Sequence, residues 1–231
     1  MHNNLKLIIF DLDGTLIDSK KDIAQAANHT LQVLGLPGLA EDIIYTFVGE
    51  GIKKLLEQCL GRDDHDLLER AWQIFCEYYR QHLLDNTVLF PGVKEILERF
   101  WFLDKIIISN KPDQFCFPVL EGLGIRSYFK MVLGGDSLPH RKPDPASIHL
   151  VIQKFALRPK QVMIVGDSGI DIECGKRASI YTCGVSYGFR SKEELEEAEP
   201  DFLIDHIEEL KMILEGSLPP PINGGLSVNK K

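Results

Sequence analysis

An apolar segment, residues 7–10, leads into Asp11 and Asp13, which are followed by Gly14 and Thr15. A short apolar run bounded by turn residues is typical of a buried strand, and a side-chain period of two places both carboxylates on one side. Two like charges about 5 Å apart repel by roughly 3 kcal/mol at an effective dielectric constant of about 20, so a cation or a shared proton must offset the repulsion. The end of this strand is therefore predicted to be a cation site.

Polar side chains also follow later apolar runs. They are Ser109, Asn110 and Lys111 after residues 106–108, Lys142 after residues 131–133 and a short loop, and Asp167 and Asp171 after residues 162–165. Ligands of an open parallel sheet bind outside the carboxyl ends of its strands. We therefore expect acids, a hydroxyl, an amide and a lysine to converge on one spot.

This set of groups suits phosphoryl transfer to a carboxylate. Phosphate monoesters hydrolyse so slowly in water that enzymes accelerate the reaction by up to ~10²¹, whereas general acid catalysis alone gives roughly 10² to 10⁴. A carboxylate nucleophile divides the reaction into two displacements, and a divalent cation neutralises the phosphoryl oxygens. Oxygen ligands without a His or Cys cluster favour Mg²⁺ over Zn²⁺.

The elements that must position these groups alternate along the chain. Apolar runs at residues 106–108, 131–133, 162–165, 180–185 and 202–204 follow helical stretches. This alternation predicts an α/β fold with a Rossmann-like, doubly wound parallel sheet as its core, covered on both faces.

About ninety residues without a convincing strand separate the first two strands of this sheet, far more than one crossover helix requires. Ser19 and Asp22 resemble a capping pair at a helix start, and an apolar and aromatic stripe over residues 67–83 has the spacing of a packed helix face. We predict a core domain of residues 1–16 and 87–215 and an inserted α-helical cap domain of residues 17–86. Residues 216–231, rich in Pro and Gly, are expected to be a disordered tail.

The composition limits the partners and the compartment. The chain has 231 residues, 44% of them apolar, and a net charge of -8 with scattered basic residues, which argues against nucleic acid and acidic membranes as partners. Five dispersed cysteines form no C-x-x-C pair, which favours a reducing compartment. No signal peptide precedes the first strand and no apolar run approaches ~18 residues. We expect a soluble, cytoplasmic protein that is a monomer or a homodimer.

Four motifs together resemble the haloacid dehalogenase superfamily, on its phosphatase branch, and most of all the phosphoglycolate phosphatases. They read Asp11-Leu12-Asp13-Gly14-Thr15-Leu16, Ser109-Asn110, Lys142, and Gly166-Asp167-Ser168-Gly169-Ile170-Asp171. The resemblance implies that Asp11 is the nucleophile that becomes an aspartyl phosphate. It also implies that Asp13 protonates the leaving oxygen and then activates water.

The resemblance implies the remaining roles as well. Mg²⁺ is held by the Asp11 carboxylate, the Asp13 backbone carbonyl and Asp167. The transferring phosphoryl group is bound by Ser109 and Lys142 with help from the Asn110 backbone, Thr15 orients the aspartate loop, and Asp171 steadies the metal site or Lys142.

The inserted helices correspond to the family's helical cap, whose closure excludes water. Gly49 and Gly51 lie where phosphoglycolate phosphatases carry a Gly-x-Gly turn, so they are candidates for substrate specificity, with a plain turn as the alternative. Glu50, Lys53 and Arg190 are expected to be solvated surface charges.

The first substrate candidate is 2-phosphoglycolate, within the class of small phosphorylated metabolites. A pyrophosphatase, a nucleotidase, or a sugar-phosphate phosphatase or β-phosphoglucomutase-like enzyme of the same superfamily remains open. Asp13 argues against a haloacid dehalogenase or a phosphonate hydrolase, which are expected to lack this acid. A non-catalytic phosphate-binding protein is the alternative from another class, although it would normally have lost one of these acids.

Overall fold

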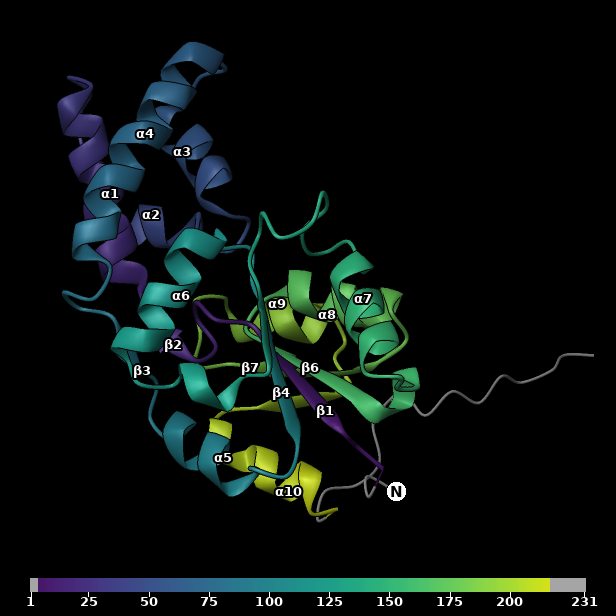
Figure 1. Ribbon diagram of the computed structural model, residues 1–231. Coiled ribbons are helices and arrows are strands. Elements are labelled where there is room, and N and C mark those ends of the chain that lie inside the picture. Colours follow the sequence, from purple (N-terminus) through teal and green to yellow (C-terminus); the bar gives the residue numbers. More distant parts are fainter. Residues whose placement is uncertain (1–3, 217–231) are drawn as a thin grey trace, which may run out of the picture.

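The computed structural model describes residues 4–216, so the predicted tail lies, apart from Gly216, outside the described residues. Its centre is a six-stranded parallel sheet with the strand order β5-β4-β1-β6-β7-β8 (Figure 1). The strands are β1 (Leu7–Phe10), β4 (Asp104–Ile108), β5 (Met131–Leu133), β6 (Val162–Gly166), β7 (Tyr181–Val185) and β8 (Phe202–Ile204). The predicted strands and the α/β class are confirmed.

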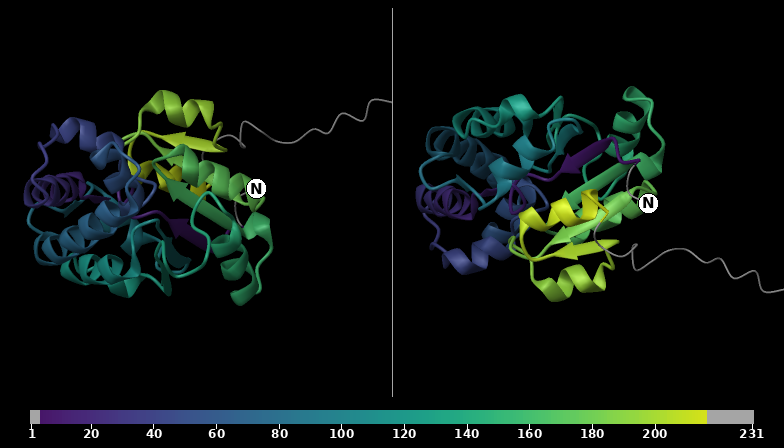
Figure 2. Two further views of the ribbon diagram at one scale, coloured as in Figure 1. Left: turned by 90° about the horizontal axis from the view of Figure 1, so that it is seen from above. Right: turned by 90° about the horizontal axis from the view of Figure 1, so that it is seen from below.

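Alternate residues of the strands bury the two faces of the sheet against different helices. Ile8 and Phe10 belong to one apolar cluster with α5 (Val93–Arg99), α6 (Asp113–Gly122) and α10 (Leu210–Leu214). Leu7 and Ile9 belong to a second cluster with α7 (Ala146–Lys154) and α8 (Gly169–Arg177). The views from above and below show helices along both sides of the sheet, as a doubly wound fold requires (Figure 2). The short helix α9 (Lys192–Glu197) precedes β8.

Four of the five helices between β1 and β4 group together in Figure 1, at upper left. They are α1 (Lys20–Val33), α2 (Glu41–Thr46), α3 (Ile52–Leu60) and α4 (His65–His82). Phe75 and Tyr79 of α4 are fully buried, so the predicted apolar stripe is a packed seam. We call these four helices the cap; its boundaries as a separate domain remain a prediction.

Two short strands between β1 and β4 escaped the sequence analysis. β2 (Ile17–Asp18) and β3 (Val88–Leu89) pair antiparallel, where the chain leaves the core and returns to it. The expectation of no strand in the ninety residues between β1 and β4 is therefore wrong. Strands of two residues are too short to show an alternating pattern, and the pairing partner lies about seventy residues away along the printed sequence.

The predicted Ser19–Asp22 capping pair does not form at the start of α1. Ser19 precedes α1 without a side-chain capping bond; its hydroxyl instead donates to Asp13 Oδ1 at 2.5 Å. Asp22 accepts hydrogen bonds from the backbone N–H groups and side chains of Asn86 and Thr87. Contacts distant in sequence have replaced the local cap. Within residues 4–216, every helix is too short or too polar to cross a bilayer.

Candidate active site

The site forms where three central strands end side by side. β1 lies between β4 and β6, with Phe10 level with Ile107 on one side and Val165 on the other. The Asp11 N–H donates to the Val165 carbonyl at 2.9 Å, which extends the pairing by one residue. The sheet order thus places the residues after β1, β4 and β6 at one edge, as predicted from the motifs.

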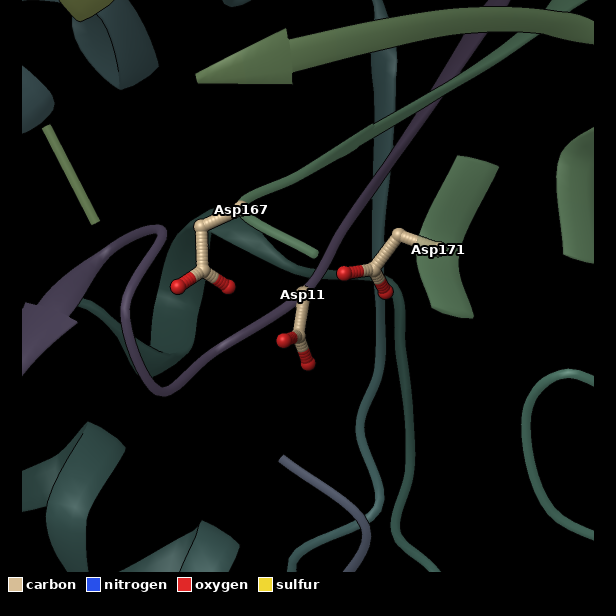
Figure 3. Close-up of side chains that lie close together, drawn as sticks. All are labelled: Asp11, Asp167 and Asp171. Carbon is tan, nitrogen blue, oxygen red and sulfur yellow. The ribbon is translucent and has the colours of Figure 1, made fainter. Parts of the chain in front are cut away.

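Three buried carboxylates meet there, those of Asp11, Asp167 and Asp171 (Figure 3). One oxygen from each lies within 4.8 Å of the others. Burial, helped by Asp171 and Asp13 and opposed by Lys142, raises the pKa of Asp11 to about 6. Burial and the charges of Asp11 and Asp171 also raise the pKa of Asp167 well above its usual value. The cluster carries more negative charge than its protein partners neutralise.

Lys142 provides positive charge on one side of this cluster. Its buried Nζ lies 2.8 Å from Asp11 Oδ1 and 2.6 Å from Asp171 Oδ1. Burial lowers the pKa of Lys142, but the two carboxylates outweigh that effect and raise it above its ordinary value. Asp171 Oδ2 accepts from the Ser168 hydroxyl at 2.6 Å, so both of its oxygens are engaged. Asp171 is thus arranged to hold Lys142 against Asp11.

The remaining carboxylate oxygens fit a hard divalent cation. Asp11 Oδ1 is buried and lies 2.8 Å from Lys142 Nζ, so Asp11 Oδ2 is the oxygen left for a cation. Asp167 Oδ2 accepts the Phe189 N–H at 2.7 Å. Gly14 packs so tightly here, with φ +86°, that an added Cβ would lie 2.1 Å from Asp167 Oδ2. All candidate ligands are oxygens, the donor type that Mg²⁺ prefers.

Asp13 faces a different set of partners from those of Asp11. Lys111 Nζ donates to both Asp13 carboxylate oxygens, at 3.0 and 3.2 Å, and to the Tyr79 hydroxyl at 2.7 Å. Burial lowers the pKa of Lys111, but Asp13 and Tyr79 outweigh it and raise the pKa above the ordinary value. The sequence analysis placed Lys111 at this strand end without giving it a role, and it did not place Tyr79 or Ser19 at the site. Lys111 was recognisable only from its position directly after Asn110.

A cavity of about 30 Å³ lies beneath the cap. Its core wall comprises Asp11, Asp13, Ser109, Asn110 and Lys111, and its cap wall comprises Ile23, Val48, Gly49, Gly51, Ile52 and Leu55. The predicted glycines are thus brought to the site. Thr15, by contrast, is fully buried and its hydroxyl has no hydrogen-bond partner among the described residues.

Arg190 corrects one expectation. Its side chain is only 19% exposed, and it donates to the carbonyls of Thr46 and Val48 in the cap, so it is not a solvated surface arginine. Lys53 matches the expectation, since its side chain is 48% exposed. Arg190 and these carbonyls are about 140 residues apart in the sequence, so no local sequence pattern predicts the contact.

The chain is similar to known proteins over most of its length. The family model of haloacid dehalogenase-like hydrolases matches residues 8–185. Proteins of Vibrio parahaemolyticus serotype O3:K6 and Vibrio cholerae serotype O1, both named phosphoglycolate phosphatase, are 35% and 37% identical to this chain. The matches cover 90% and 88% of this chain and 95% and 94% of the relatives.

A solved structure agrees with these sequence matches. The crystal structure of a protein from Haemophilus somnus 129PT, described as a predicted phosphoglycolate phosphatase, has a TM-score of 0.87 at 33% identity. The superposition covers 91% of this chain and 98% of that one. The chain therefore belongs to the haloacid dehalogenase-like hydrolase family, and within that family it is a phosphatase.

Proposed function

We propose that this phosphatase works through an aspartyl phosphate on Asp11. A carboxylate oxygen of Asp11 attacks phosphorus, the bond from phosphorus to the leaving oxygen breaks, and Asp13 gives that oxygen a proton. Asp13 then takes a proton from water, whose oxygen displaces Asp11 and releases inorganic phosphate. The observation that carries this proposal is the buried Asp11 carboxylate, 2.8 Å from Lys142 Nζ, in a cavity that Asp13 also lines.

We assign the metal site to the Asp11 and Asp167 carboxylates and the Asp13 backbone carbonyl. Mg²⁺ bound there would neutralise phosphoryl oxygens and the acids around them. Lys142 adds a fixed positive charge, and Ser109 with the Asn110 backbone completes the phosphate cradle. Asp171 supports Lys142 through the 2.6 Å contact described above.

The substrate proposed first is 2-phosphoglycolate. Two observations support it besides the names of the curated relatives. The cavity lies between the cap and the strand ends, so the cap restricts the size of the leaving group. Lys111 provides a second ammonium in the same cavity, suited to a carboxylate on that leaving group.

All five cysteines are free, which supports action in a reducing compartment such as the cytoplasm.

The test is a substrate panel on the full chain, with and without a chelator. Phosphoglycolate, pyrophosphate, sugar phosphates and nucleoside monophosphates are compared by kcat/KM. We expect phosphoglycolate to rank first, and the chelator to abolish turnover until Mg²⁺ is restored. If pyrophosphate, a nucleotide or a sugar phosphate ranks higher, the substrate assignment changes and the phosphatase mechanism stands.

The nucleophile is tested by Asp11→Asn, with Asp66→Asn on the exposed first turn of α4 as the matched control. We expect the first variant to lose at least ~10³ of kcat, because an amide cannot form the phosphoenzyme, and the second to retain wild-type kcat. Intact turnover in Asp11→Asn would show that another group attacks phosphorus. If the wild-type protein binds phosphate but turns over no substrate of the panel, the non-catalytic alternative is favoured instead.

A further inference from the structure

The turn between α2 and α3, residues 46–51, is held to the core by hydrogen bonds to its backbone carbonyls. Arg190 donates to the Thr46 and Val48 carbonyls, both at 2.7 Å. Arg141 Nη1 donates to the Glu50 carbonyl at 3.0 Å. Asn110 Nδ2 donates to the Gly49 carbonyl at 3.0 Å. Three core side chains thus bind four carbonyls of one cap turn.

These carbonyls need donors from elsewhere. Thr46 is the last residue of α2, and the final carbonyls of a helix have no partner within the helix. Arginine side chains commonly satisfy such carbonyls, and one guanidinium can serve two of them. Arg190 therefore completes a helix end that belongs to the cap, although it is itself attached to the core.

Each donor is also linked to the phosphate or metal site. Arg141 directly precedes Lys142, and Asn110 directly follows Ser109. Arg190 follows Phe189, whose N–H donates to Asp167 Oδ2 at 2.7 Å. The position of the cap turn is therefore set from two loops that carry proposed phosphate ligands and from the Arg190 loop, which contacts the proposed metal ligand Asp167.

The glycines of the turn fit this contact. A Cβ on Gly51, where φ is +92°, would lie 2.5 Å from Arg141 Nη1 and 3.1 Å from the Asn110 carbonyl. A Cβ on Gly49 would lie 3.3 Å from Arg190 Nη2. The Gly-x-Gly pattern fits the positive φ of both residues, +127° and +92°, together with the approach of the two arginines.

We propose that Arg141 and Arg190 are positioning residues that clasp the cap turn over the active site when the cap is closed and release it for substrate entry, an inference that rests on the proposed phosphatase function. Both arginines line a groove that also contains Lys142 and Glu50 and lies open at the cap–core junction. Release of the clasp would join this groove to the inner cavity. The clasp itself touches no reacting atom.

The test compares Arg190→Ala and Arg141→Ala with Arg177→Ala, using the full chain. Arg177 lines the same groove but bonds to Glu173 and to the Pro143 carbonyl, so it controls for the positive charge of the groove. Hydrogen–deuterium exchange is measured at the amides of residues 46–56 and of β6. We expect at least a fivefold faster exchange in the cap segment of the two clasp variants, with β6 unchanged and the control like wild type.

Kinetics provide the second readout. We expect the clasp variants to lose about tenfold in kcat with little change in KM, and Arg190→Lys to recover part of the loss, since lysine can serve one carbonyl. Exchange in residues 46–56 equal to that of Arg177→Ala would overturn the clasp. Exchange requires no turnover, so this result can be told apart from a failure of the phosphatase proposal. Arg141 is exposed, so Arg141→Ala provides the test if Arg190→Ala does not fold.

Discussion

At the scale of single residues, the site depends on how each charge is partnered. Asp171 is fully buried, and Lys142 and Ser168 occupy its two oxygens. Burial and neighbouring carboxylates raise the pKa values of Asp11 and Asp167, so a bound cation would stabilise their ionised forms. This division separates an acid that supports the lysine from acids that can hold a cation.

The Asp171→Asn substitution tests this division. We expect kcat/KM to fall by roughly 10- to 100-fold, because the amide no longer holds the Lys142 ammonium in place by its charge. Inhibition by inorganic phosphate should weaken in parallel. Glu173→Gln, on the same helix and half exposed, is the matched control and should behave as wild type. Unchanged phosphate inhibition in Asp171→Asn would contradict the supporting role.

Lys111 is tested by substitution with methionine and by comparison of two substrates. We expect kcat/KM for phosphoglycolate to fall roughly 10- to 100-fold more than for a phosphate ester with a neutral leaving group, since a charged hydrogen bond contributes about 1.5–3 kcal/mol. The ratio between substrates cancels the effect of losing the Asp13 contact. Tyr79→Phe, which keeps the ammonium, should leave that ratio near the wild-type value. Equal losses on both substrates would show that Lys111 serves Asp13 alone.

At the scale of elements, one aspartate ties the start of the cap to its end. Asp22 in α1 is buried, and it accepts hydrogen bonds from Asn86 and Thr87, just before β3. β2 and β3 pair antiparallel at the same crossing between core and cap. The two chain passages are therefore joined by a short ladder and by one buried carboxylate.

The Asp22→Ala variant is expected to lose roughly 3 kcal/mol of unfolding free energy, because buried N–H and hydroxyl donors are left without an acceptor. Urea unfolding measures this loss. Asp66→Ala, at the exposed first turn of α4, should change the free energy by less than about 0.5 kcal/mol. Equal stability of the two variants would show that the bridge adds nothing to the fold.

At the scale of the whole molecule, the acidic cluster links stability, pH and metal. The pKa of Asp11 is raised from 3.8 to about 6, so the folded metal-free protein holds this proton more tightly than the unfolded chain. That contribution to stability is complete below about pH 4 and is lost as the pH rises through about 6. A bound cation favours the ionised carboxylate and therefore acts in the opposite direction.

Thermal unfolding of the full chain at pH 5 and pH 7.5, with and without Mg²⁺, measures this linkage. At pH 7.5, Mg²⁺ at about 100 times its Kd should stabilise the protein by roughly 2.7 kcal/mol. At pH 5, protonation of Asp11 should weaken binding about tenfold and reduce that gain by about 1.4 kcal/mol. In Asp11→Asn the Mg²⁺ effect at pH 7.5 should shrink, because one of the two proposed carboxylate ligands is lost. An equal Mg²⁺ effect at both pH values in the wild type would argue against Asp11 as a ligand.

The sequence alone determined the core of this fold and the composition of its site. Runs such as Ile106–Ile108 and Val162–Val165 indicate strands because apolar periodicity is a local property, and the motifs after them lie at strand ends by chain connectivity. Even the family resemblance depends on those local motifs.

Only the tertiary structure decided which side chains face one another. The pairing of Lys111 with Asp13, the hold of Asp22 on Thr87, and the reach of Arg190 to the cap turn each join residues far apart in the chain. Such contacts follow from the packing of the cap on the sheet edge, and neither propensity nor periodicity encodes them within a short window. Ser19 resembled a helix cap in sequence, whereas in the folded protein its hydroxyl donates to Asp13, the acid that we propose as the proton donor.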